Sequence, residues 1–172
     1  MKGFVLGIFL TIAAALTGAY YFVTGGAMPV GQDVKPGRLE TWVAKASLRA
    51  AIGRQTTGLT DPLPPTAENL AAGVMLYNMH CRTCHGGPDG MASSIAKGLT
   101  PDPPQLAKHG VEDDPEATTH WKITHGIRFT GMPAYGQTLS DGEIWQLTLF
   151  LKHMDSLPPG PREDWTSSKS GP

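Results

Sequence analysis

The stretch CRTCH at residues 81–85 decides how the rest of the sequence is interpreted, because it holds the only two cysteines among the 172 residues. Two thiols three positions apart can form a redox-active disulfide, supply half of a metal site, or attach a cofactor covalently. The pattern around the motif, and the histidine that ends it, must distinguish these three possibilities.

The disulfide, zinc and iron–sulfur interpretations each lack something that their chemistry requires. A redox pair of this spacing usually lies near a βαβ pattern, and no alternating strand pattern surrounds the motif. A structural zinc site takes four ligands, usually from two spaced pairs, and an iron–sulfur cluster generally takes four thiolates. The sequence offers a single pair of cysteines.

The full pattern Cys-x-x-Cys-His is typical of the covalent attachment of a c-type haem. Positions i and i+3 of a helix share one face, so the sulfurs of Cys81 and Cys84 can both form thioether bonds to the vinyl groups on one porphyrin edge. His85 follows at the end of the helix, where its ring can turn under the porphyrin and offer a nitrogen to the iron. The motif therefore predicts one covalent haem c with His85 as an axial ligand.

The beginning of the chain is apolar, with no charged side chain between Gly3 and Gln32. Residues 3–23 are long enough to cross a hydrocarbon layer of about 30 Å. A secretory signal peptide is the alternative, but its apolar core is normally about 7 to 15 residues, so the length favours a retained membrane anchor at 1–27. Because haem is attached to such motifs outside the cytoplasm, we expect the haem domain on the periplasmic or extracytoplasmic side of the membrane.

Residues 28–65 are expected to form a linker that contains one amphipathic helix at 38–54. Its apolar residues recur at spacings of three and four. They are Leu39, Trp42, Val43, Ala46 and Ala50. The pattern fits a helix on lipid headgroups, on a partner subunit or on the chain's own globular part, and does not decide among them.

The compact domain is expected at residues 66–160. Helical patterns cover three stretches, at 66–81, 115–126 and 140–159, and little between them alternates with the period of a strand. Three short helices with long loops leave a thin core, which a large buried prosthetic group would complete. Residues 161–172 are expected to be a disordered tail.

These features together resemble a membrane-anchored monohaem c-type cytochrome of class I. The similarity covers about residues 66–157 and rests on CRTCH at the end of a first helix, on TGMPAYG at 130–136, and on a last helix that contains Trp145. The resemblance implies an all-α fold, with three main helices and long loops wrapped around one haem. A transmembrane helix and the amphipathic linker helix would precede this domain.

The resemblance also implies how the first and last helices of the domain pack. They would cross where the small Gly73 permits a close approach. Tyr77 would then stack near Trp145 or Phe150.

The second axial position of the iron separates electron transfer from chemistry at the metal, because only an open position lets the iron bind a substrate such as peroxide. Met132 is favoured because Gly131 and Pro133 bracket it, and because the family's sixth ligand resembles this methionine in a loop before the last helix. A histidine is the main competitor. The other candidates are Met91, His109, His120, His125 and His153.

Other contacts of the haem follow from the resemblance. In the family, the imidazole ligand donates its other nitrogen to a carbonyl of a proline-containing loop. Pro103 or Pro104 would supply this carbonyl. Trp121 and Arg128 are candidates for the haem propionates, although surface or core positions are equally compatible with their types.

The charge pattern and the motif together predict an electron carrier rather than an enzyme. Residues 66–172 carry eight basic against twelve acidic side chains, so no nucleic acid is expected as a partner. We expect redox partner proteins, including a membrane complex, and no small-molecule substrate. Alternatives are an accessory haem subunit of a larger respiratory or photosynthetic complex and, less favoured, a haem peroxidase or gas-binding protein with an open iron site.

Overall fold

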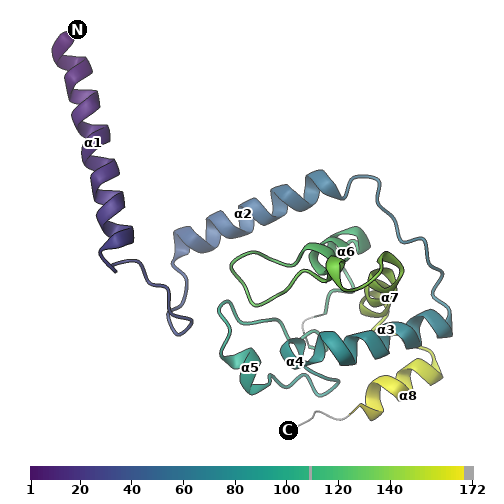
Figure 1. Cartoon of the computed structure of the whole chain (residues 1–172). Helices are drawn as coiled ribbons and strands as arrows, with labels where there is room; N and C mark the ends of the chain where they lie inside the picture. Colours follow the sequence, from purple (N-terminus) through teal and green to yellow (C-terminus); the bar gives the residue numbers. More distant parts are fainter. Residues whose placement is uncertain (109, 169–172) are drawn as a thin grey trace. The chain divides into compact units, whose positions relative to one another are not determined.

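The computed structural model describes residues 1–108 and 110–168, and within them every regular element is a helix (Figure 1). This confirms the all-α fold for the part of the chain that is described. The elements are α1 (Lys2–Thr24), α2 (Arg38–Gln55), α3 (Ala67–His80), α4 (Arg82–His85), α5 (Ser94–Lys97), α6 (Glu116–His125), the 3-10 helix η1 (Tyr135–Gln137), α7 (Asp141–Lys152) and α8 (Pro159–Ser167).

The chain divides into two units, Met1–Val34 and Lys35–Pro172. The first unit consists mainly of α1, whose side chains are exposed along its whole length. This helix is long and apolar enough to cross a membrane, a test that a signal sequence near an N-terminus also passes. All other helices belong to the second unit.

Side-chain caps fix where the two main helices of the domain begin. The Thr66 hydroxyl accepts a hydrogen bond from the Asn69 amide at 3.3 Å, which starts α3. At the start of α7, Ser140 and Glu143 form the reciprocal pair that their spacing predicts, with the Ser140 amide donating to the Glu143 carboxylate at 2.8 Å. Helix α7 ends at Lys152, earlier than the expected helix at 140–159.

Helices α3 and α7 pack against each other at Gly73, as the family resemblance implies. A Cβ atom at this position would lie 2.6 Å from the Cβ of Phe150 and would clash with the carbonyl oxygen of Gln146. One turn on, the Tyr77 ring meets Phe150 edge-on with 5.4 Å between ring centroids. The glycine therefore sets the distance at which the aromatic side chains of the two helices interlock.

The expectation of a disordered tail from residue 161 is wrong over Pro161 to Ser167, where the chain forms α8. Pro158 and Pro159 lie at the start of this helix, a place that suits proline because its missing N–H has no partner there. Trp165 is buried, and its ring lies 5.3 Å from both Tyr77 and Phe150. This aromatic cluster attaches α8 to the core and extends the domain beyond residue 160.

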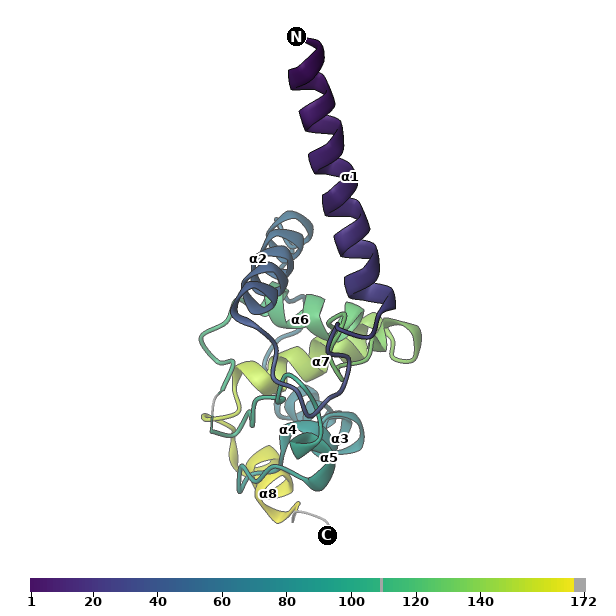
Figure 2. The same cartoon turned by 90° about the vertical axis from the view of Figure 1, so that its left-hand side faces the viewer.

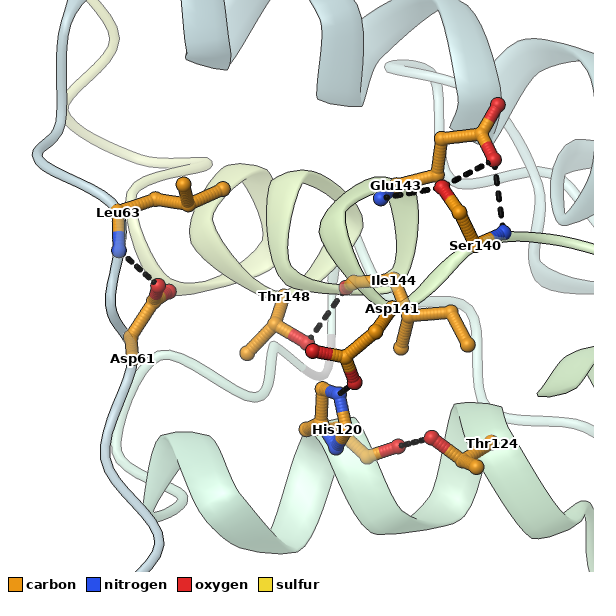
Figure 3. A network of polar contacts seen from close by, with 9 residues as sticks. All are labelled: Asp61, Leu63, His120, Thr124, Ser140, Asp141, Glu143, Ile144 and Thr148. Carbon is orange, nitrogen blue, oxygen red and sulfur yellow. Dashed lines mark hydrogen bonds and ion pairs between the residues drawn. The ribbon is translucent and has the colours of Figure 1, made fainter.

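Trp145 packs away from Tyr77, so of the two expected partners of Tyr77 only Phe150 is confirmed. Trp145 stacks on His120 with 4.0 Å between ring centroids. The His120 ring also shares a hydrogen bond of 3.0 Å with the carboxylate of Asp141 (Figure 3). This contact joins α6 to the start of α7.

Helix α2 packs on the domain through Ile52, which is buried, and through its C-terminal residue. The indole N–H of Trp121 in α6 donates to the side-chain oxygen of Gln55 at 3.0 Å. Both views place α2 beside α6 (Figures 1 and 2). The helix therefore does dock on the chain's own globular part, but of the predicted apolar face Leu39, Trp42, Val43 and Ala50 stay exposed, and Ala46 is partly buried.

Candidate haem-attachment site

The CRTCH segment continues from the end of α3 as one further helical turn, which ends at His85. Cys81 lies between α3 and α4, its amide donates to the Tyr77 carbonyl at 2.9 Å, and the His85 amide donates to the Cys81 carbonyl at 2.9 Å. Gly86 then takes a φ of 76°, which ends the helix directly after His85. Cys81 and Cys84 are therefore one turn apart, and both are unpaired and partly buried.

A carbonyl oxygen fixes the orientation of the His85 ring. Its Nδ1 lies 2.9 Å from the carbonyl oxygen of Pro104, and because a carbonyl only accepts, Nδ1 carries the hydrogen. Burial lowers the pKa of His85, although the bond to Pro104 opposes this shift. The lowered pKa favours the neutral imidazole, and with the hydrogen on Nδ1 the neutral ring keeps its lone pair on Nε2, the form in which histidine binds a metal. Of the two expected prolines, Pro104 makes the contact.

Gln105, which follows Pro104, reinforces the position of the His85 ring, and no sequence pattern indicated this role. The Gln105 side chain donates from Nε2 to the carbonyls of Cys84 and Pro103, each at 3.1 Å. The next amide, of Leu106, donates to the His85 carbonyl at 3.2 Å. Because Gln105 and Cys84 are 21 positions apart, no local pattern could have revealed the contact.

Tyr77 supports the same segment from the other side. Its hydroxyl donates to the carbonyl of Gly86 at 2.9 Å and lies 3.2 Å from that of His85. Burial raises the pKa of Tyr77, so the hydroxyl is protonated and acts as a donor at neutral pH. Tyr77 therefore connects the aromatic cluster of the core to the backbone that carries His85.

Met132 lies in a closed loop before α7, as expected. The Ile127 amide donates to the Met132 carbonyl at 3.2 Å, and the Met132 amide donates to the Thr130 hydroxyl at 3.1 Å. Its side chain is partly buried against the core. The hydroxyl of Tyr135 donates to the His80 carbonyl at 2.6 Å, which ties this region to the residue before Cys81. Coordination by Met132 stays a prediction.

The other candidate ligands have different surroundings. His120 is engaged by Trp145 and Asp141 in the core. His125 is exposed beside Trp121, His153 follows α7, and the Met91 side chain is 63% exposed. His109 lies outside the described residues.

The two candidate propionate contacts also stay predictions. The N–H of Trp121 is bonded to Gln55 on α2. Arg128 is exposed in the loop that follows α6.

The residues of this site fit a covalent haem better than a metal ion held by the protein alone. Among the described residues, no group of three or more His, Cys, Asp or Glu side chains is placed to bind a metal ion. Cys81 packs against the hydrophobic core, and this burial raises the pKa of its thiol to about 12. Apolar surroundings of this kind suit a porphyrin edge. Apolar side chains that pack on the same core are Leu106, Met132, Tyr135 and Leu139.

Comparison with family models identifies the kind of domain that carries this segment. Residues 68–151 match the family model described as "Cytochrome C oxidase, cbb3-type, subunit III". A chain of the Kuenenia stuttgartiensis reducing HAO-like protein complex is similar at 27% identity over 55% of this chain, with a TM-score of 0.47. The match spans less than half of that chain, 46% of its length. No curated protein matches significantly. The matched residues include the CRTCH segment and nearly all of the crossing helices α3 and α7. Over these residues, the protein carries a c-type cytochrome domain of class I.

Proposed function

We propose that this protein is a single-electron carrier with one haem c, attached through Cys81 and Cys84 and coordinated by His85 and Met132. The bond between the His85 ring and the Pro104 carbonyl carries this proposal, because it engages Nδ1 and leaves Nε2 as the nitrogen that can bind the iron. Bound haem supplies an iron that changes its oxidation state by one electron, as in other cytochromes of this family.

The protein's own residues make this exchange selective. The Pro104 carbonyl holds the imidazole in one tautomer, and Tyr77, Gln105 and Leu106 hold the backbone that carries it. A methionine sulfur on the opposite side would close the iron to substrates and favour the reduced state relative to a second histidine. These roles predict a carrier of moderately high potential without chemistry at the metal.

We also propose that α1 anchors the domain at the outer face of a membrane. The length and composition of this helix support the anchor. Haem is attached to such motifs outside the cytoplasm, which supports the outer face of the membrane as the side on which the domain lies. A tether raises the effective concentration of the carrier near a membrane-bound redox partner without any new contact. The partners would be proteins, one of them a membrane complex.

Substitution of Met132 tests the axial ligand. We expect the oxidised haem protein to show the weak long-wavelength band of methionine-ligated iron and the reduced protein to be inert to carbon monoxide. Met132→Ala should lose the band and bind carbon monoxide, whereas Met91→Ala, a matched change at an exposed methionine, should behave like the natural protein. Rapid carbon monoxide binding by the natural protein would instead support a peroxidase or gas-binding function.

A second candidate function is that of a haem subunit in a larger oxidoreductase complex. The matched family model is described as an oxidase subunit, which favours this possibility. Solubilisation of the native membrane in mild detergent, followed by native electrophoresis with detection of haem, separates the two functions. Stable companions in the haem-containing band would support the subunit, and migration as a single small species would support the independent carrier.

A further inference from the structure

Helix α2 is apolar on two sides, and the domain covers only one of them. With about 100° of rotation per residue, Leu48 and Ile52 share the side that faces α6. Ile52 is 8% exposed and Leu48 is partly buried. This side is enough to dock the helix on the domain.

The opposite side of α2 carries a second stripe of apolar residues, which we call the outer stripe. It consists of Leu39, Trp42, Val43 and Ala50, which are exposed, and of Ala46, which is partly buried. The three largest side chains, those of Leu39, Trp42 and Val43, are 73%, 64% and 47% exposed. Large apolar side chains gathered on one exposed face usually mark a surface that binds a membrane, a ligand or another protein.

Positive charge borders the outer stripe. By the same helical geometry, Arg38 and Arg49 lie along one edge of it and Arg54 along the other. Glu40 is the single acidic residue of the helix. The remainder of the domain is acidic in balance, so α2 concentrates cations where its apolar residues are exposed. An apolar stripe with tryptophan and basic borders is the composition of helices that lie in the interface of an anionic membrane.

The chain itself limits how far α2 can lie from the anchor. Residues 25–37 join α1 to α2, and thirteen residues span at most about 45 Å when fully extended. If α1 crosses a membrane, α2 begins within this distance of the membrane surface. The membrane surface is therefore always within reach of the outer stripe, whereas a partner protein would first have to bind.

We propose that the outer stripe of α2 lies in the headgroup region of an anionic membrane and fixes the orientation of the cytochrome domain on it. Leu39, Trp42 and Val43 insert among the lipids, while the bordering arginines pair with lipid phosphates. This inference rests on the anchoring by α1 proposed above. It adds a second, reversible attachment that the span alone does not supply.

The test is alkylation of a single introduced cysteine in the full-length haem protein, reconstituted in vesicles. Cys81 and Cys84 are consumed by the haem, so Ala46→Cys reports the outer stripe. Ser47→Cys is the matched control, an exposed neighbour about 100° round the helix on its polar side. A membrane-impermeant hydrophilic maleimide measures access in vesicles of phosphatidylcholine with or without phosphatidylglycerol.

We expect phosphatidylglycerol to slow alkylation at residue 46 at least about fivefold relative to residue 47 on the same, outward-facing side of the vesicle. In the Ala46→Cys protein, the pair Arg38→Glu and Arg49→Glu should abolish this protection, and Arg38→Lys with Arg49→Lys should keep it. Because Ala46 is already partly buried in the protein, the ratio of the two alkylation rates without phosphatidylglycerol is the reference. A ratio that phosphatidylglycerol leaves unchanged would overturn the proposal. Protection found only in native membranes, and not in these vesicles, would overturn it in favour of a partner protein.

Failure of the anchor can be distinguished from failure of this inference. Protein that an alkaline carbonate wash releases from the vesicles lacks a spanning anchor, which would refute the tether itself. Protein that is retained but freely alkylated at residue 46 refutes only the role of the outer stripe. The haem spectrum is recorded on the same samples. Only samples with a full complement of haem are compared, so loss of the haem cannot cause either outcome.

Discussion

At the scale of single residues, Tyr77 serves the core and the site at once. Its ring belongs to the aromatic cluster with Phe150 and Trp165, and its hydroxyl donates to the backbone of the haem-attachment segment. We expect Tyr77→Phe to lower the free energy of unfolding of the haem protein by about 1–2 kcal/mol, because the buried Gly86 carbonyl loses its donor while the ring remains. Denaturant unfolding followed by haem absorbance measures this.

Tyr135→Phe is the comparison for that change. It removes one hydrogen bond, to the His80 carbonyl, from a position that is only partly buried. A smaller loss of stability is therefore expected. If Tyr77→Phe were no more destabilising than Tyr135→Phe, the supporting role of the Tyr77 hydroxyl would be refuted.

His120 gives the fold a dependence on pH. Burial lowers the pKa of His120, and the hydrogen bond and charge of Asp141 and the charge of Asp61 oppose this shift while His125 adds to it. The unfolded chain therefore takes up this proton first, so the stability is present above about pH 6.5 and is lost as the pH falls below it. His120→Asn should flatten the loss of unfolding free energy between about pH 6.5 and pH 5.

Asp141→Asn checks the sign of this effect. The variant keeps a side-chain oxygen to accept from His120 but removes the charge that opposes the lowered pKa. The loss of stability with acid should then become steeper than in the natural protein. A slope unchanged by both substitutions would show that His120 does not control acid stability.

At the scale of the helices, Gly73 controls how closely α3 approaches α7. Gly73→Ala would place a methyl group against Phe150 and the Gln146 carbonyl, so we expect a loss of about 1–3 kcal/mol or more in unfolding free energy. Gly53→Ala is the matched control in α2, because its added methyl group meets nothing within 4 Å. The control should gain about 0.5–1 kcal/mol from helix propensity alone. Equal effects would refute the tight crossing.

The helices that the sequence predicted were those with a clear apolar period or cap. Thr66 and the Ser140–Glu143 pair have the residue types and spacing of helix caps, and they cap α3 and α7 in the structure. Helix α8 was missed because its stability comes from one buried aromatic, Trp165, in an otherwise polar stretch. A single side chain creates no period, and its partners Tyr77 and Phe150 are distant in sequence.

The same distinction applies to the candidate site. Cys81, Cys84 and His85 form a local motif, so their spacing alone predicted their chemistry. The choice of Pro104 over Pro103 depends on a contact with His85 that spans 19 positions, and local pattern left both open. For α2, both sides of the helix are apolar, so periodicity could not tell that Ile52 would face the domain and Trp42 would not.

At the scale of the whole molecule, the intact mass of the membrane-extracted protein reports anchor and cofactor together. We expect the mass of the uncleaved chain plus one haem, because α1 is longer than a signal core requires and CRTCH offers a single attachment motif. Electrospray mass spectrometry of the detergent-purified protein measures this. A chain shortened near residues 17–27, with haem attached, would show that the leader is removed.

One contact joins the last described residues to the motif. The guanidinium of Arg82, inside CRTCH, donates from Nη2 to the Ser168 carbonyl at 2.7 Å. During synthesis and export the amino-terminal part of a chain emerges first, so Cys81 and Cys84 leave the ribosome 84 residues or more ahead of Ser168. If export proceeds from the same end, Cys81 and Cys84 reach the attachment machinery before Ser168 does. We therefore expect the contact between Arg82 and Ser168 to form after the haem is attached and to close the carboxyl-terminal residues over the motif.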